Sequence, residues 1–128
     1  MSYHFTKAIA TGFDEAIERT KEALQAEGFG VLTEIDVKAT LKKKLDVDFK
    51  KYHILGACNP PFAYKALQAE DKIGTMLPCN VVVQEQADGI VEISAVDPIA
   101  SMQAVKNDNL GKIATAVQQK LKKVIESI

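Results

Sequence analysis

The chain is 128 residues long, with 47% hydrophobic residues, 26% charged residues and a formal net charge of −1. This length and composition are typical of one globular domain, which can bury a core without the help of a disulfide or a metal. The near-neutral charge excludes a global field that would attract nucleic acid or an anionic membrane surface. We therefore expect one domain over residues 1–128 and no nucleic-acid partner.

The beginning of the chain carries no recognisable targeting signal. Residues 1–7 lack the basic region and the apolar core of a signal peptide. No apolar run approaches the roughly 18 residues that a membrane-spanning helix needs. We therefore expect a cytoplasmic protein with no membrane partner, in a reducing compartment where a permanent disulfide does not form.

The first part of the chain predicts two strands and two helices. Aromatic and β-branched residues predict a strand over residues 3–9. Thr11 offers an N-cap to a helix whose apolar stripe ends before Gly28. Alternating residues predict a half-buried strand over residues 30–36, and Asp36 can cap a short lysine-rich helix that follows it.

The middle of the chain predicts a buried strand that leads directly into a helix. Residues 52–58 have the apolar character of such a strand. Asn59 then precedes two prolines, and asparagine is a favoured N-cap while proline costs little in the first helical turn. We therefore expect a helix to begin after Asn59.

The last part of the chain predicts a β-hairpin followed by a long helix. Strand-like runs over residues 79–85 and 90–96 flank Asp88-Gly89, a strong hairpin signal. From Asn107 onward, apolar residues recur at three- and four-residue steps. The full order of elements favours an α+β fold, with a mostly antiparallel sheet packed against helices that include the long C-terminal one.

One dipeptide occurs twice, as Cys58-Asn59 and Cys79-Asn80, and these two copies contain both cysteines of the chain. Each copy lies where an apolar strand-like run meets a turn. If the two strands are antiparallel neighbours, the thiols lie at the same end of the sheet. If they are parallel, the thiols lie a strand length apart, roughly 20 Å. The topology therefore decides whether the two cysteines can form one site.

Two interpretations of the cysteines are open at this stage. Cys58 precedes a predicted helix N-terminus, where the dipole and the free N–H groups favour a thiolate, so it can be a reactive thiol with Cys79 as its resolving partner or a second ligand. Alternatively, both cysteines are small buried hydrophobes and the asparagine side chains bond to turn backbone.

Metal binding and catalysis find less support in the sequence. Two thiolates could bind a soft ion, but a closed tetrahedral site would also need His4 or His53. His53 lies an odd number of positions from Cys58 and therefore points to the opposite strand face. We expect no metal site, the sequence identifies no cofactor, and no motif assigns an enzyme class.

Two segments carry a resemblance to a known family, residues 54–60 (ILGACNP) and residues 74–83 (GTMLPCNVVV), with further support from residues 35–42. Over essentially the whole chain the sequence resembles the "domain of unknown function 302" family. The sequence departs from the family pattern at Asp46, because the pattern leads us to expect a glycine directly after the lysine-rich helix. The resemblance implies an α+β fold similar to the TATA-binding-protein-like class, with a curved antiparallel sheet, and it implies a homodimer. It supplies no activity.

Two hypotheses about function follow. In the first, the chain is a small-ligand-binding or thiol-handling module in which Cys58 and Cys79, with Asn59 and Asn80 as hydrogen-bond partners, line a pocket between the sheet and a helix start. In the second, it is a structural or interaction domain that acts as a homodimer and has inert, buried cysteines. An enzymatic redox role ranks third, because the thiols are 21 positions apart (79 − 58) and do not form a Cys-x-x-Cys motif.

Overall fold

The computed structural model describes residues 2–128 and contains a five-stranded sheet in which every neighbouring pair of strands is antiparallel. The order across the sheet is β1-β5-β4-β3-β2. The strands are β1 (His4–Ile9), β2 (Gly30–Asp36), β3 (Tyr52–Cys58), β4 (Cys79–Glu85) and β5 (Val91–Val96). The predicted α+β class is confirmed.

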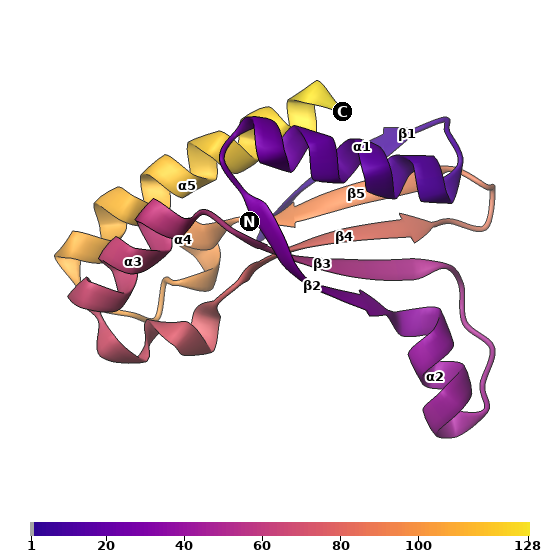
Figure 1. Cartoon of the computed structure of the whole chain (residues 1–128), viewed down its shortest axis with the longest axis horizontal. Coiled ribbons are helices and arrows are strands. Elements are labelled where there is room, and N and C mark those ends of the chain that lie inside the picture. The colour runs from indigo at the N-terminus through magenta and orange to yellow at the C-terminus, as the bar shows by residue number, and fades with distance from the viewer. Residues whose placement is uncertain (1) are drawn as a thin grey trace.

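Two long helices cover one face of this sheet (Figure 1). They are α1 (Phe13–Ala26) and α5 (Asp108–Ser127). The shorter elements α3 (Pro60–Ala69), the 3₁₀-helix η1 (Asp71–Met76) and α4 (Pro98–Ser101) gather at one end of the strands, and α2 (Val37–Leu45) projects at the other end (Figure 1). Within residues 2–128, no helix covers the second face of the sheet, and none is long and apolar enough to cross a bilayer.

The covered face of the sheet supplies the main core. Leu55 on β3, Val81 on β4 and Ile93 on β5 are fully buried, and they belong to one cluster with Leu24 of α1 and Leu121 of α5. Removing a side chain of this size from water stabilises the fold by about 1.5–3 kcal/mol. Because successive residues of a strand point to opposite faces, the residues between these core positions point toward the uncovered face.

The caps of the helices are partly as predicted. The side chain of Asp36 accepts a hydrogen bond from a backbone N–H group at the start of α2, which confirms the predicted cap. The side chain of Asn107 accepts a corresponding hydrogen bond at the start of α5 and occupies the N-cap position of that helix. The predicted cap at Thr11 is wrong, because Gly12 occupies the N-cap position of α1. The Thr11 hydroxyl instead donates to the carboxylate of Glu15 in the first helical turn.

A left-handed backbone ends α2 where the family pattern leads us to expect glycine. Asp46 has a φ of 53°, and its N–H donates to the carbonyl of Lys42. Glycine adopts this conformation without the steric cost that a Cβ atom brings. Asp46 therefore adopts the left-handed conformation that we expect for a glycine, so the turn is kept and the aspartate within it is strained.

Candidate functional site

The structure brings the two cysteines to the same end of the sheet. Strands β3 and β4 are antiparallel neighbours, and Ala57 lies directly opposite Cys79. Cys58, the next residue, and Cys79 both line one cavity with a volume of about 40 Å³. Of the two topologies left open by the sequence, the one that allows a shared site is therefore the correct one.

The cavity lies at the ends of β3 and β4, where α3, α4 and α5 meet the sheet. Its wall consists mainly of aromatic and aliphatic side chains, among them Phe29, Phe62, Leu77, Ile113 and Val117. The residues that line it include no Asp, Glu, Lys or Arg. A single water needs about 10–15 Å³ by this measure, so the cavity has room for about three waters or one small group of heavy atoms.

The two thiols have different environments. Cys79 begins β4 on the helix-covered face and is only 8% exposed. Burial, with a smaller contribution from the nearby Cys58, raises the pKa of the Cys79 thiol to about 11. Cys79 therefore stays protonated at neutral pH and is a poor nucleophile.

Cys58 is half-buried and ends β3, one residue before the helix cap. Because Ala57 shares its sheet face with Cys79, strand alternation directs Cys58 toward the opposite face. The cavity reaches both residues because it lies at the strand ends. Cys58 and Cys79 therefore both line the cavity, but their positions on the strands direct their side chains to opposite faces of the sheet.

Asn59 has a structural partner that the sequence did not reveal. It occupies the N-cap position of α3 as predicted, but the prediction that its side chain caps the helix is wrong. Its Nδ2 atom donates to the carbonyl oxygen of Glu27 at 3.2 Å, directly after α1. A helix end leaves such carbonyl groups without partners inside the helix. Asn59 therefore ties the end of α1 to the start of α3 beside the cavity.

Asn80 lies away from the other three predicted site residues. It is opposite Gly56 on β4, is exposed, and points to the uncovered face of the sheet. There it lines a shallow trough of about 370 Å³ together with His4, Thr6 and Gln84. Cys79 and Asn80 are adjacent on β4, and their side chains therefore point to opposite faces of the sheet.

The uncovered face of the sheet is a second candidate site, and the sequence did not reveal it. We call it the open face, and the strand register defines its members. They are Gly30, Thr33, Ile35, Tyr52, Ile54, Gly56, Cys58, Asn80, Val82, Gln84, Glu92, Ser94, Val96, His4, Thr6 and Ala8. Only Glu92 among them carries a carboxylate or an ammonium or guanidinium group. The sequence contained one signal of this face, which is the absence of lysine and arginine from alternate positions of the strands. That signal could be recognised only once the order of the strands in the sheet was known.

The two histidines each have local partners. His53 Nε2 lies 3.0 Å from Glu34 Oε1, and Lys21 Nζ lies 3.0 Å from the other oxygen of Glu34. The hydrogen bond with His53, followed by that with Lys21, lowers the pKa of Glu34. His4 Nδ1 lies 2.6 Å from the Thr6 hydroxyl. Among residues 2–128, no group of three or more His, Cys, Asp or Glu side chains could hold a metal ion.

The fold and the site together define an α+β protein with helices on one sheet face and a thiol-containing apolar cavity at the strand ends. The chain belongs to the family described as Domain of unknown function DUF302, whose model matches residues 5–128. The resemblance carried by residues 54–60 and 74–83 is thereby confirmed.

The structure is also similar to a solved one. This is the crystal structure of an uncharacterized conserved DUF302 protein from Bacillus stearothermophilus, with 32% sequence identity and a TM-score of 0.92. The similarity covers 99% of this chain and 98% of that chain. No curated protein matches the chain. The family and the neighbouring structure support the fold and assign no activity.

Proposed function

We propose that the chain works as a single-domain, small-ligand-binding module and that the cavity at the ends of β3 and β4 is its site. The observation that carries this proposal is that one cavity is lined by Cys58, Asn59 and Cys79 and is otherwise apolar. Apolar surface removed from water contributes about 25 cal/mol per Å², so this wall favours an apolar ligand. The volume of about 40 Å³ limits the buried part of that ligand to a few heavy atoms.

The two thiols have separate roles in this proposal. A pKa of about 11 keeps Cys79 protonated, so it serves as part of the apolar wall. Cys58 is half-buried, and it is the thiol that ligands and reagents can reach. Any thiol-handling chemistry at this site therefore belongs to Cys58. Two unpaired thiols also suit the reducing cytoplasm, where we propose that the protein works.

Selective alkylation tests the proposed roles of the thiols. We expect iodoacetamide to modify Cys58 in the folded protein and Cys79 only after unfolding, as measured by peptide mass spectrometry between pH 7 and 10. If both thiols react only on unfolding, Cys58 is inaccessible and the thiol-handling role should be dropped.

Binding of a small probe tests the cavity itself. We expect xenon, a single apolar atom small enough for a cavity of about 40 Å³, to shift the amide NMR signals of residues that line the cavity in the wild-type protein. Ala63→Leu places a larger side chain on the cavity wall and should abolish these shifts, whereas Ala116→Leu on α5, outside the lining residues, should retain them. Wild-type protein that shows no shifts at the cavity would refute the binding proposal.

A second candidate function is an interaction domain that acts as a homodimer. The observation that favours it is the open face, which is a whole sheet face without a covering helix in residues 2–128 and with a single charged side chain. Sedimentation equilibrium tests this candidate directly. A dimer at micromolar concentration is expected, and a monomer at 100 μM would rule the homodimer out.

A further inference from the structure

We infer that residues 37–51, which comprise α2 and the segment that follows it, form a docking surface for an acidic segment of a different protein. We call these residues the arm. The inference goes beyond the proposed ligand site, because the arm and the cavity lie at opposite ends of the strands (Figure 1).

The first observation is that the arm packs little against the rest of the fold. Helix α2 has nine residues and none of them is buried, and every residue from 42 to 51 is exposed. The exposed fraction is 66% for Leu45, 43% for Val47 and 39% for Phe49. A helix of this length is marginal in water unless something packs against it. Clustered apolar side chains on such a projecting segment indicate a surface that another molecule covers.

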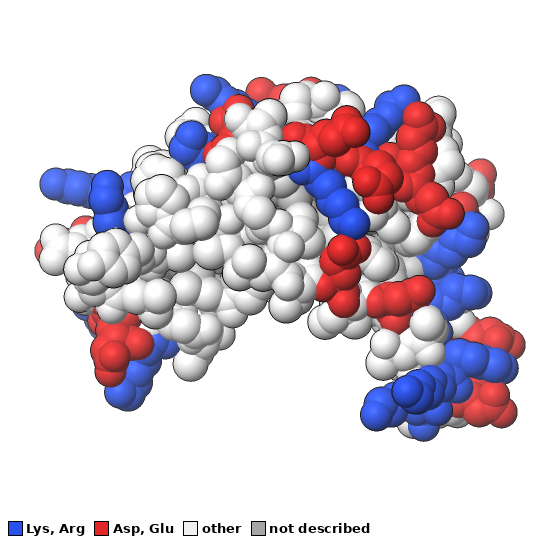
Figure 2. Space-filling view, in the orientation of Figure 1, with Lys and Arg blue, Asp and Glu red and all other residues white. Residues whose placement is uncertain are grey.

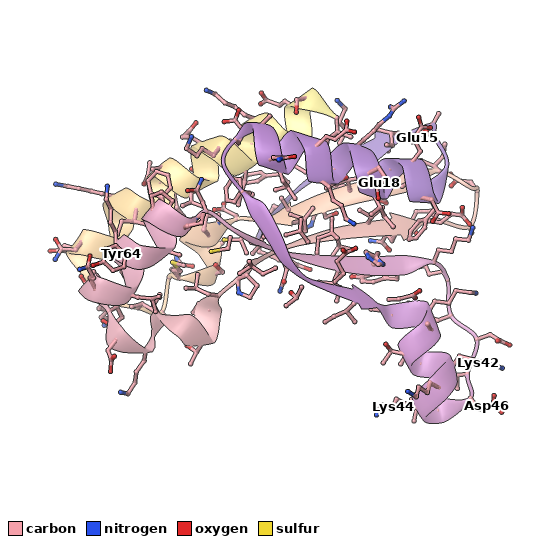
Figure 3. The ribbon with its side chains drawn as sticks, in the orientation of Figure 1. Glu15, Glu18, Lys42, Lys44, Asp46 and Tyr64 are labelled. Atoms are coloured by element: carbon pink, nitrogen blue, oxygen red, sulfur yellow. The ribbon has the colours of Figure 1, made fainter. Side chains whose placement is uncertain are left out.

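The second observation is the concentration of positive charge on the arm. It contains six of the 16 basic residues and only two acidic ones, Asp46 and Asp48, so its net charge is +4. Because the whole chain has a net charge of −1, the remaining residues carry −5. Figure 2 shows acidic side chains gathered over α1 and lysines over the arm, and Figure 3 places Lys42 and Lys44 at the far end of the arm. The near-neutral total charge is therefore compatible with a strongly basic local surface.

This positive charge acts locally. At physiological ionic strength, interactions between exposed charges are largely screened beyond about 8 Å. Because the arm projects from the sheet, the acidic residues of the other elements do not cancel its charge at the far end (Figures 1 and 2). The arm therefore attracts a partner that carries several carboxylates, and such complementarity raises both the rate and the specificity of association.

A groove between α2 and the segment after it gives the arm a place for an apolar side chain. The groove has a volume of about 350 Å³, far larger than that of the cavity at the strand ends. Ala39, Val47 and Phe49 supply its apolar wall, and Lys38 and Lys42 also line it. Lys38 Nζ donates to the Phe49 carbonyl at 2.8 Å, which joins the two sides of the groove. The groove therefore suits an aliphatic or aromatic side chain that is flanked by carboxylates.

Lys43 and Lys44 are the lysines that we expect to meet those carboxylates. Lys42 is already paired within the arm, because its Nζ atom lies 3.1 Å and 3.4 Å from the carboxylates of the two aspartates. Within residues 2–128, no ion pair joins Lys43 or Lys44 to an acidic side chain. Lys43 lies four residues after Ala39, so the two residues share the groove side of the helix.

The two aspartates favour a protein segment over a surface of phosphates. The side chains of Asp46 and Asp48 are 88% and 89% exposed beside the lysines. A nucleic acid or an anionic membrane presents many phosphates, which would approach these carboxylates as well as the lysines. The arm also lacks arginine, the side chain whose planar fork matches phosphate oxygens best. An acidic protein segment can instead place its carboxylates on the lysines and uncharged groups near the aspartates.

A synthetic acidic peptide tests the inference. The probe is the fluorescein-labelled peptide EEDLFEDE, and its binding to the full chain is followed by fluorescence anisotropy. We expect a Kd below about 100 μM at low salt, and an affinity at least about tenfold weaker when the ionic strength rises from about 0.05 M to about 0.5 M, because salt screens exposed charges. The peptide EEDSSEDE lacks the apolar side chains and should bind at least about fivefold more weakly, because it leaves the groove empty.

Charge reversal on the arm locates the binding site. The double variant Lys43→Glu with Lys44→Glu should bind EEDLFEDE at least about tenfold more weakly than the wild type. The control is the double variant Lys112→Glu with Lys123→Glu, which reverses two exposed lysines of α5 and changes the net charge equally. It should keep the wild-type affinity within about twofold, because it lies outside the arm. If the arm variant fails to fold, amide NMR of the wild type replaces it, and the probe should shift the signals of the residues that line the groove.

The possible outcomes separate this inference from the proposed function. A wild-type protein that does not bind EEDLFEDE, or an equal loss of affinity in both double variants, overturns the docking surface and leaves the xenon test of the cavity intact. Equal affinity for the two peptides overturns the groove as part of the surface. Tighter arm-dependent binding to a short DNA duplex, or to vesicles of equimolar phosphatidylcholine and phosphatidylglycerol, overturns an acidic protein segment as the occupant. Arm-dependent peptide binding without xenon binding supports the docking surface and refutes the cavity proposal alone.

Discussion

Gly56 is the glycine at which the fold leaves least room for a side chain. It lies within β3, opposite Asn80 of β4 and Thr33 of β2, and is buried. A Cβ atom at this position would overlap Thr33 Oγ1 and would lie 2.8 Å from Pro78 Cγ. Glycine is therefore required here by the close approach of neighbouring side chains. We predict that Gly56→Ala destabilises the protein.

The magnitude follows from the two contacts. Forcing an extra methyl group into a packed site costs about 1–3 kcal/mol. Alanine recovers about 0.5–1 kcal/mol of this, because it restricts the unfolded chain more than glycine does. The expected net loss in the free energy of unfolding is about 1–2 kcal/mol. For a domain of 128 residues, this corresponds to a fall in Tm of about 3–10 °C.

Urea denaturation followed by circular dichroism measures this loss, and a double-mutant cycle identifies its cause. In Thr33→Ala the overlapping hydroxyl is absent, and the Thr33 Cβ atom would lie 3.4 Å from the new methyl group, an ordinary contact. Gly56→Ala should therefore cost at least about 0.5 kcal/mol less in the Thr33→Ala background than in the wild type. The reasoning is refuted if Gly56→Ala changes stability by less than about 0.5 kcal/mol, or if Thr33→Ala leaves its cost unchanged.

The remaining predictions concern four polar residues. The lowered pKa of Glu34 means that its carboxylate contributes stability in full above its ordinary pKa of about 4.5 and loses it as the pH falls through the lowered pKa. Glu34→Gln should therefore reduce the slope of Tm against pH between 2 and 5, and an unchanged slope would contradict this. Asp46→Gly should raise the free energy of unfolding in urea by about 0.5–1 kcal/mol, because the residue has a φ of 53°, whereas a loss of stability would show that its exposed side chain matters more. Asn59→Ala should cost about 1–2 kcal/mol in the same assay, because it removes a partly buried hydrogen bond. Asn80→Ala should change stability by no more than about 0.5 kcal/mol, because Asn80 is exposed, and equal costs for both asparagines would contradict their assignment to different environments.

Local patterns were sufficient to predict most of the secondary structure. The predicted bounds of β2, β3 and β4 agree with the structure, because alternation and flanking turn residues act over only a few positions. The hairpin before β5 was also predicted, and Gly89 within it has a φ of 83°. The 3₁₀-helix η1 was not predicted, because residues 71–76 carry no periodic apolar pattern.

The candidate site was predicted in part. The doubled dipeptide led to Cys58, Asn59 and Cys79, which do line one cavity. The hydrogen bond from Asn59 to Glu27 joins residues 32 positions apart, so no local pattern could reveal it. The open face could not be recognised either, because its residues come from five strands whose order is not the order of the chain.

The sequence by itself determined that each cysteine stands at a strand end beside an asparagine, because strand periodicity and turn residues are local properties of the chain. Only the tertiary structure decided that β3 and β4 are antiparallel neighbours, which brings Cys58 and Cys79 to one cavity. It also decided which face of the sheet the helices cover, and therefore that Cys79 is buried while Asn80 is exposed. The physical reason is that pairing and burial depend on contacts between distant segments, which no short stretch of sequence contains.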